Sequence, residues 1–164
     1  KDFNKENNFE EYIPKEGDMF LAINDALIAA QTTVLAAEDF GLGSCYIGDI
    51  MENFEIHKEL FNLPKYTLPI TMLCIGYPTE QQKNRTMRRR YFSKDMIVHK
   101  NSYRKPSVEE FKAMDKEIAE KDSPVFLPGC HNQAIHMYKR KITSDFMSEM
   151  NRSVKAMIDS WMED

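Results

Sequence analysis

The chain has 164 residues, of which 42% are hydrophobic and 29% are charged, and its formal net charge at pH 7 is −4. A chain of this length corresponds to one domain and is long enough to bury a hydrophobic core. The negative net charge argues against a general nucleic-acid-binding protein. No stretch of 18 consecutive apolar residues is present, so the sequence predicts no membrane span and no membrane partner.

The cysteines and histidines show no spacing typical of a metal site. Cys45, Cys74 and Cys130 lie far apart and form no CxxC pair, so they predict neither a zinc site nor a disulfide framework. Free cysteines together with 11 methionines indicate a reducing, cytoplasmic environment. The four histidines do not share a ligand spacing either, and the sequence therefore predicts no metal.

The first elements are an arm followed by a long helix. Residues 1–18 are polar and contain Pro14 and Gly17, which predicts a loop or a loosely held arm. Alanines recur at helical spacing from Met19 onward, which predicts a helix that closely approaches another element. Gly41 is placed to end this helix in the left-handed region.

The middle of the chain is predicted to contain one short helix and one or two strands. A helix is expected from Asn53 to Phe61, and the apolar run from Leu68 to Tyr77 predicts a buried strand. Residues 79–95 are polar and basic, which predicts a long surface loop. Residues 96–99 are expected to form a short strand.

The last third of the chain is predicted to be helical. Ser107 and Glu110 form a capping-box pattern for a helix over residues 108–121. A final helical region follows, with an expected break near Thr143. Its last part carries an amphipathic stripe, interpreted as a packing face, that consists of Phe146, Met150, Val154, Met157 and Trp161.

The segment GLGSCYIG, residues 41–48, contains three glycines and has two interpretations. Glycine lets backbone N–H groups approach a flat or anionic ligand because no Cβ stands in the way. A helix cap followed by a tight turn explains the same residues, and spacing alone favours that explanation. The pattern of a P-loop is absent.

A basic segment lies between Lys83 and Arg104, where eight Lys or Arg residues accompany a single acid, Asp95. Arginine side chains suit phosphate oxygens because they are always charged and bind in a bidentate manner. A phosphate-bearing ligand and a solvated loop paired with acids elsewhere are equally compatible with this segment. A nucleic-acid patch is less favoured because few aromatic residues are interleaved.

The order of these pieces resembles the FMN-dependent nitroreductase family. The resemblance rests on the pattern Asn24-Asp25-Ala26-x-x-Ala29-Ala30-Gln31 within the alanine-rich helix, then Leu35-Ala36-Ala37, GLGSCYIGDI, Leu-Pro, a strand that ends Ile75-Gly76-Tyr77-Pro78, and the basic segment. The tail over residues 139–161 is similar to the C-terminal extension of a bacterial subgroup of the family.

The resemblance implies an α+β protein with a three-layer fold. A central mixed, mainly antiparallel sheet is flanked by helices and is completed by dimerisation and a C-terminal helical extension. Residues 1–164 are expected to form a single partial domain with an arm (1–18), an FMN-binding core (19–105) and the helical extension (106–164). The Arg-Arg-Ser-x-Arg segment with which family members begin is absent, so roughly the N-terminal half of the fold is expected to be missing before Lys1. Either the chain is a fragment of a longer one, or other copies or a separate polypeptide complete the fold.

The implied function is that of an NAD(P)H-dependent FMN oxidoreductase acting as a homodimer. NAD(P)H would reduce FMN by hydride transfer to flavin N5, and nitroaromatics, quinones or related small acceptors would reoxidise it in a ping-pong cycle. The flavin would carry the chemistry, so no catalytic side chain is expected. A non-enzymatic flavin-binding protein on the same fold and an interaction module without FMN are the alternatives.

The resemblance also assigns cofactor-binding residues. The N–H of Gly48 would point toward flavin N5, and Ile47 would lie against the isoalloxazine ring. Arg88 and Arg90 would contact the FMN phosphate, with Lys83 and Arg85 as the alternative register. Further candidates from the glycine-containing segment are Ser44, Cys45, Tyr46 and Asp49.

Overall fold

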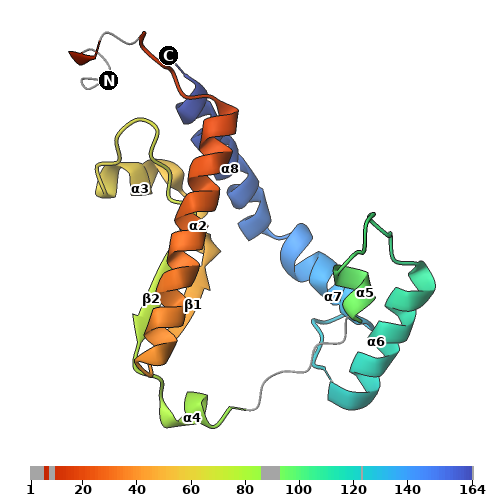
Figure 1. Cartoon of the computed structure of the whole chain (residues 1–164). Helices are drawn as coiled ribbons and strands as arrows, with labels where there is room; N and C mark the ends of the chain where they lie inside the picture. Colours follow the sequence, from red (N-terminus) through yellow and green to blue (C-terminus); the bar gives the residue numbers. More distant parts are fainter. Residues whose placement is uncertain (1–5, 8–9, 86–92, 123, 164) are drawn as a thin grey trace. The chain divides into compact units, whose positions relative to one another are not determined.

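The computed structural model describes residues 6–7, 10–85, 93–122 and 124–163, and its longest element is an apolar helix in the first part of the chain (Figure 1). The chain divides into two compact units, residues 1–83 with 149–164 and residues 84–148. The first unit contains residues 44–49, for which contacts with the flavin ring are predicted. The division of the chain into an arm, a core and an extension stays a prediction.

Helix α2 (Glu16–Asp39) has a defined start and a defined end. It begins three residues before the predicted Met19, because the Asp18 carboxylate accepts a hydrogen bond from the Lys15 N–H at 2.9 Å and so satisfies the first turn. At its other end Gly41 has φ +71°, and Leu42 N–H donates to the Ala37 carbonyl at 2.9 Å. This is a Schellman motif, and the predicted glycine cap is confirmed.

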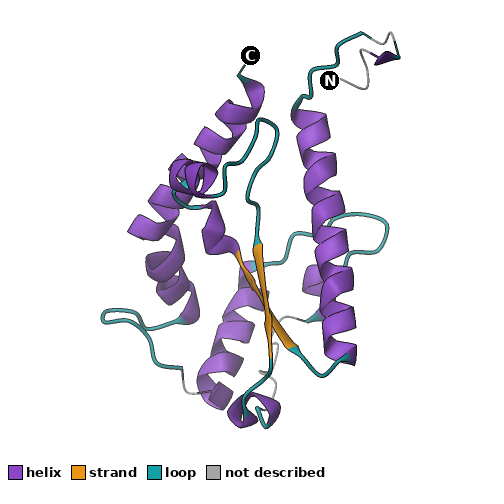
Figure 2. Ribbon diagram, turned by 90° about the vertical axis from the view of Figure 1, so that its left-hand side faces the viewer, coloured by secondary structure: helices purple, strands orange, loops and turns teal. Residues whose placement is uncertain are grey.

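Strands β1 (Gly43–Ile47) and β2 (Met72–Gly76) form a two-stranded antiparallel sheet in which Cys45 lies opposite Cys74. Of the helix cap and tight turn that spacing favoured for residues 41–48, the cap at Gly41 is confirmed but the tight turn is wrong over residues 43–47, which form a strand. Backbone pairing with a segment about thirty residues away decides the conformation here, and a local glycine pattern does not report such pairing. Helix α2 packs against β1 (Figure 2).

The predicted strand over residues 68–77 is shorter than expected and is not buried. β2 begins at Met72, and four of its five residues are exposed. Residues 68–71 of the apolar run are not part of a strand.

The core of the first unit joins three helices. Helix α3 (Phe54–Leu60) and helix α8 (Asp145–Met162) bury Phe54, Met157 and Trp161 together with Met19 of α2. The stripe predicted on α8 is confirmed, because all five of its residues are buried or half-buried. The indole N–H of Trp161 donates to the Lys15 carbonyl at 3.1 Å, so α8 ends against the start of α2.

Helix α2 leaves much apolar surface uncovered. Phe20, Leu21, Ile28 and Leu35 are each 60–66% exposed. By length and composition alone α2 could cross a membrane, which the count of consecutive apolar residues did not reveal. Its contacts with β1 and α8 are those of a helix in a globular fold, and the cytoplasmic location stays a prediction.

The described parts of residues 79–99, on both sides of the division between residues 83 and 84, contain more helix than predicted. Residues 79–95, expected to be a loop, include helix α4 (Glu80–Lys83) and the start of helix α5 (Lys94–Ile97). The strand predicted over residues 96–99 is wrong. Val98 N–H donates to the Lys94 carbonyl at 2.7 Å, and this local bond outweighs the β-branched composition.

The second unit contains the predicted helix α6 (Val108–Asp122). Its capping box is confirmed, because Ser107 N–H donates to the Glu110 carboxylate at 2.7 Å and Glu110 N–H donates to the Ser107 hydroxyl at 3.2 Å. Helix α7 (Gln133–Met137) runs into the π-helical turn η2 (Tyr138–Ile142). This turn produces the predicted break near Thr143, before α8 begins.

Replacement of Trp161 by alanine is expected to lower the free energy of unfolding by about 3–5 kcal/mol, because a buried aromatic side chain is lost. The variant also removes the contact with the Tyr66 ring, whose centroid lies 5.2 Å from that of Trp161. Urea unfolding followed by far-UV circular dichroism measures the change. W161F keeps an aromatic ring but loses the hydrogen bond to the Lys15 carbonyl, so its free energy of unfolding should fall by about 1 kcal/mol. Equal losses in both variants would contradict the packing role.

Candidate functional site

The predicted flavin-contacting residues meet where β1 passes into a 3-10 turn, η1 (Gly48–Met51). Ser44, Cys45, Tyr46 and Ile47 lie on β1, and Gly48 and Asp49 begin the turn. Ile47 keeps the extended conformation, with φ −119° and ψ 107°. The structure therefore brings these six residues together in one continuous strand-to-turn junction.

The two faces of β1 have different neighbours. The Tyr46 hydroxyl lies 3.5 Å from the Gln31 amide oxygen, to which it donates, so this face is turned toward α2. Because side chains alternate along a strand, Cys45 and Ile47 belong to the opposite face. The Ile47 carbonyl accepts a hydrogen bond from the Thr71 hydroxyl at 3.4 Å, which ties the end of β1 to the segment before β2.

Gly48 is open to approach from outside the chain. A Cβ built on it would meet only the Met51 methyl group, at 3.9 Å. Its φ is not positive, unlike that of Gly41, so backbone conformation does not demand a glycine at this place. A backbone with so little side-chain cover is compatible with the approach of a flat ring such as the isoalloxazine part of FMN, and the flavin contact stays a prediction.

The next segment, residues 51–55, is held by α8, which the sequence did not reveal. Arg152 donates two hydrogen bonds to the Glu55 carboxylate, at 2.7 and 2.9 Å, and two more to Glu149, both at 2.8 Å. Hydrogen bonds from Arg152 lower the pKa of Glu55 to about 2. The same guanidinium lowers the pKa of Glu149. These polar positions lie beside the apolar stripe of α8, and sequence spacing does not indicate which segment they meet.

The basic segment is only partly described. Arg88 and Arg90, the predicted phosphate contacts, lie outside the described residues. Lys83 pairs with Glu80 at 2.6 Å, and Arg104 donates to both carboxylate oxygens of Glu110 at 2.9 Å. Some of the basic residues are thus engaged with acids, as the solvated-loop interpretation expected.

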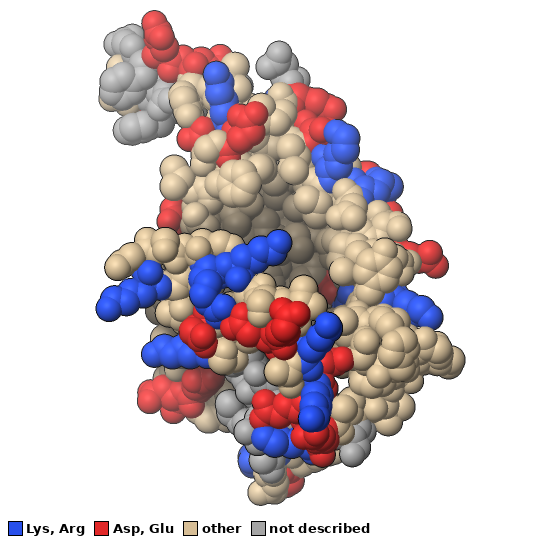
Figure 3. Space-filling view, turned by 90° about the vertical axis from the view of Figure 1, so that its right-hand side faces the viewer, with Lys and Arg blue, Asp and Glu red and all other residues tan. Residues whose placement is uncertain are grey.

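The described surface mixes charges of both signs. On the face drawn in Figure 3, Lys and Arg side chains lie among Asp and Glu side chains. Within residues 6–7, 10–85, 93–122 and 124–163, no group of three or more His, Cys, Asp or Glu side chains is arranged to hold a metal ion.

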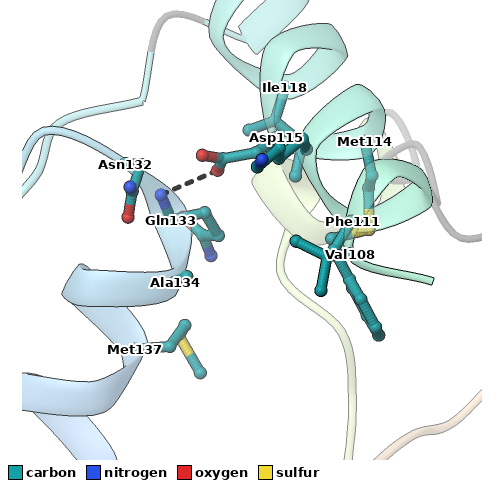
Figure 4. A pocket seen from close by; sticks show the side chains of 10 residues that line it. Val108, Phe111, Met114, Asp115, Ile118, Asn132, Gln133, Ala134 and Met137 are labelled. Carbon is teal, nitrogen blue, oxygen red and sulfur yellow. Dashed lines mark hydrogen bonds between the residues drawn. The ribbon is translucent and has the colours of Figure 1, made fainter. Parts of the chain in front are cut away.

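The second unit contains a cavity of about 490 Å³ between α6 and α7 (Figure 4). Its wall is mostly apolar and includes Phe111, Met114 and Met137. The carboxylate in this wall, Asp115, already accepts a hydrogen bond from the Gln133 N–H at 2.8 Å. The cavity therefore resembles a packing site more than a site for a charged cofactor, and the β1–η1 junction is the better candidate.

Comparison with known proteins points to one family. The nitroreductase family model matches residues 4–77, which include α2, β1, η1 and β2. The oxygen-insensitive NADPH nitroreductase of Salmonella typhimurium is 34% identical over 102 residues, which cover 62% of this chain and 41% of that protein. These matches support a member of the nitroreductase family.

A second relative is named for its action on a flavin. The FMN reductase (NADPH) of Bacillus subtilis is 34% identical over 87 residues, 52% of this chain and 33% of that protein. The chain thus spans less than half the length of either relative.

Solved structures show the fold. The NADPH:FMN oxidoreductase of Vibrio harveyi, determined in complex with NAD+, aligns with a TM-score of 0.67 and 20% identity, over 96% of this chain and 62% of that chain. The expected nitroreductase-like α+β fold is confirmed by this likeness, and the described residues supply two antiparallel strands and their helices.

The Glu55–Arg152 pair predicts a pH dependence. A carboxyl group whose pKa is lowered on folding, here from 4.5 to about 2, stabilises the fold above its unfolded pKa, and this contribution is lost as the pH falls. The difference in urea midpoint between the wild type and E55Q should therefore shrink between about pH 4.5 and about pH 2. E59Q, at an exposed position of the same helix, is the control; an equal response of both variants would contradict the pairing.

Proposed function

We propose that the protein to which this chain belongs is an FMN-dependent oxidoreductase that uses NADPH or NADH as reductant. The observation that carries the proposal is the open Gly48 backbone directly after the half-buried Ile47, in a chain that matches the nitroreductase family model over residues 4–77. The names of the relatives, an NADPH nitroreductase and an FMN reductase (NADPH), support it.

The residues of the junction would bind and orient the flavin. Ile47 offers an apolar face to the ring, and Gly48 offers its N–H toward flavin N5, where it would act as a fixed hydrogen-bond donor. Secondary contacts would come from Ser44, Cys45, Tyr46 and Asp49. Arg88 and Arg90 remain the predicted contacts of the FMN phosphate.

The cofactor would supply the electron chemistry, since bound FMN can take a hydride from NAD(P)H and pass the electrons to a nitroaromatic, a quinone or a related acceptor. Reductant and acceptor would use the same place in turn, as a ping-pong cycle requires. The chain's own residues bind, orient and shield the ring, so no acid–base side chain is assigned.

A homodimer is part of the proposal because apolar side chains of α2 are exposed to solvent. Its exposed apolar residues, among them Phe20, Leu21 and Ile28, form a surface that a second subunit would bury. Nitroreductase-type assembly of two subunits would also complete the sheet and the flavin site.

Anaerobic titration of the FMN-loaded, full-length protein with NADPH or NADH tests the proposal. The visible flavin absorbance should disappear and should return when a nitroaromatic or a quinone is added. Bound FMN that neither reductant bleaches would establish the non-enzymatic flavin-binding alternative instead. Failure of the full-length protein to retain FMN would favour the interaction module.

Substitution of Gly48 by proline is expected to weaken FMN binding by about two- to ten-fold, because it deletes the proposed N–H donor, which is worth about 0.5–1.5 kcal/mol. The backbone accepts proline here, since Ile47 is extended and Gly48 is the first residue of η1. G48A keeps the N–H and meets only the flexible Met51 side chain, so it is the matched control. Fluorescence titration with FMN measures both, and equal affinities in G48P and the wild type would reject the donor role.

A further inference from the structure

A single buried hydroxyl links the C-terminal helix to the turn that follows Gly48. Ser153 of α8 is 0% exposed. Its hydroxyl donates a hydrogen bond to the Met51 carbonyl at 2.6 Å and accepts one from the Phe54 N–H at 2.9 Å. Serine satisfies both backbone groups at once because a hydroxyl is donor and acceptor together.

A second side chain of α8 holds the residue between these two contacts. The Glu149 carboxylate accepts a hydrogen bond from the Asn53 N–H at 3.1 Å. Positions 149 and 153 are four apart and therefore lie on one face of the helix. Three backbone groups, at residues 51, 53 and 54, are thus fixed by one helical face.

The fixed segment has a defined and unusual backbone. Asn53 adopts the left-handed conformation, with φ +51° and ψ +45°, immediately before α3 begins. Asparagine is one of the few residues besides glycine that enter this region readily, so the residue suits the conformation. The hydrogen bond from its N–H to Glu149 of α8 holds it there.

The constraint reaches Gly48 through only one short turn. Met51 is the last residue of η1, and Gly48 is the first. The Met51 methyl group lies 3.9 Å from the place where a Cβ of Gly48 would stand. A four-residue turn whose end is anchored leaves little freedom to its beginning, so the anchor at Met51 also sets the direction of the Gly48 N–H.

We propose that Ser153 is a positioning residue that, acting through the Met51 carbonyl, orients the flavin-facing backbone at Gly48. The proposal deepens the proposed function and rests on it for the identity of the ligand. It assigns to the C-terminal helix a part in cofactor binding, although this helix lies about one hundred residues further along the chain than the junction.

Two variants with similar loss of atoms separate positioning from general packing. S153A deletes the buried hydroxyl, whereas S160A deletes a half-buried one on the same helix that accepts from the Lys58 ammonium at 2.8 Å. S153C fills the space of serine with a weak hydrogen-bonding group and should therefore behave like S153A. The three proteins are compared with the wild type under conditions in which circular dichroism shows all of them folded.

The first measurement needs no cofactor. Amide hydrogen exchange should become at least ten-fold faster in S153A and S153C at Phe54, which loses its acceptor, and at Glu52, whose N–H donates to the Asp49 carbonyl across η1, and should stay unchanged in S160A. Faster exchange at Phe54 alone, with Glu52 as in the wild type, would show that the hydroxyl only supports α3, and the positioning role would be rejected.

The second measurement concerns bound FMN. S153A should bind FMN at least ten-fold more weakly, and the visible circular dichroism of the bound flavin should change, while S160A matches the wild type. Wild-type FMN affinity and an unaltered flavin spectrum in S153A would overturn the proposal. If the wild type itself takes up no FMN, the proposed function fails, and hydrogen exchange still decides whether Ser153 orders the turn.

Discussion

The antiparallel pairing of β1 with β2 is the interaction on which the rest of the first unit depends. It fixes the register in which Ile47 lies opposite Met72 and leaves Gly48 just beyond the last ladder position. A shift by one residue would turn Tyr46 away from Gln31 and expose the opposite set of side chains. The Schellman motif at Gly41 contributes to this register, because it delivers the chain from α2 into β1 within a few residues.

The site combines a short-range and a long-range part. The strand-to-turn junction is contiguous in sequence, and its residues are held by neighbours in β2 and α2. The segment after it is held by α8, through a buried hydroxyl and a network of Arg152 with two carboxylates. Exposed ion pairs contribute little stability by themselves, so the stabilisation that the arginine network gives is expected to be small. The buried Ser153 bonds, in contrast, would leave two backbone groups unsatisfied if they were lost.

Sequence signals that act over one or two helical turns predicted the corresponding local structures correctly. The cap at Gly41, the capping box at Ser107 and Glu110, and the apolar stripe of α8 all depend on residues within one or two turns, and the structure contains each of them. The strand character of residues 43–47 depends on a partner strand, and the residues alone favoured a cap and a turn. The family resemblance supplied the identity of the candidate site, which glycine spacing could not do.

Other features had no sequence signal that could have revealed them. Val98 is β-branched, yet a helical hydrogen bond to Lys94 governs its segment. Ser153 lies among polar and apolar residues of an amphipathic helix, and nothing in its surroundings indicates that it meets residues 51 and 54. Such contacts are defined by tertiary packing, so they require the three-dimensional arrangement of α8 and α3.

The sequence separation of the Ser153 contacts has a consequence for synthesis on the ribosome. Phe54 and Ser153 are 99 residues apart. At about 5–20 residues per second, translation places roughly 5–20 s between the appearance of the turn and that of its anchor. During this interval α2, β1 and β2 can already form, but the turn after Gly48 has no partner for its backbone groups. At the proposed flavin site, ordering of the turn is therefore expected to follow release of the C-terminal helix rather than formation of the sheet.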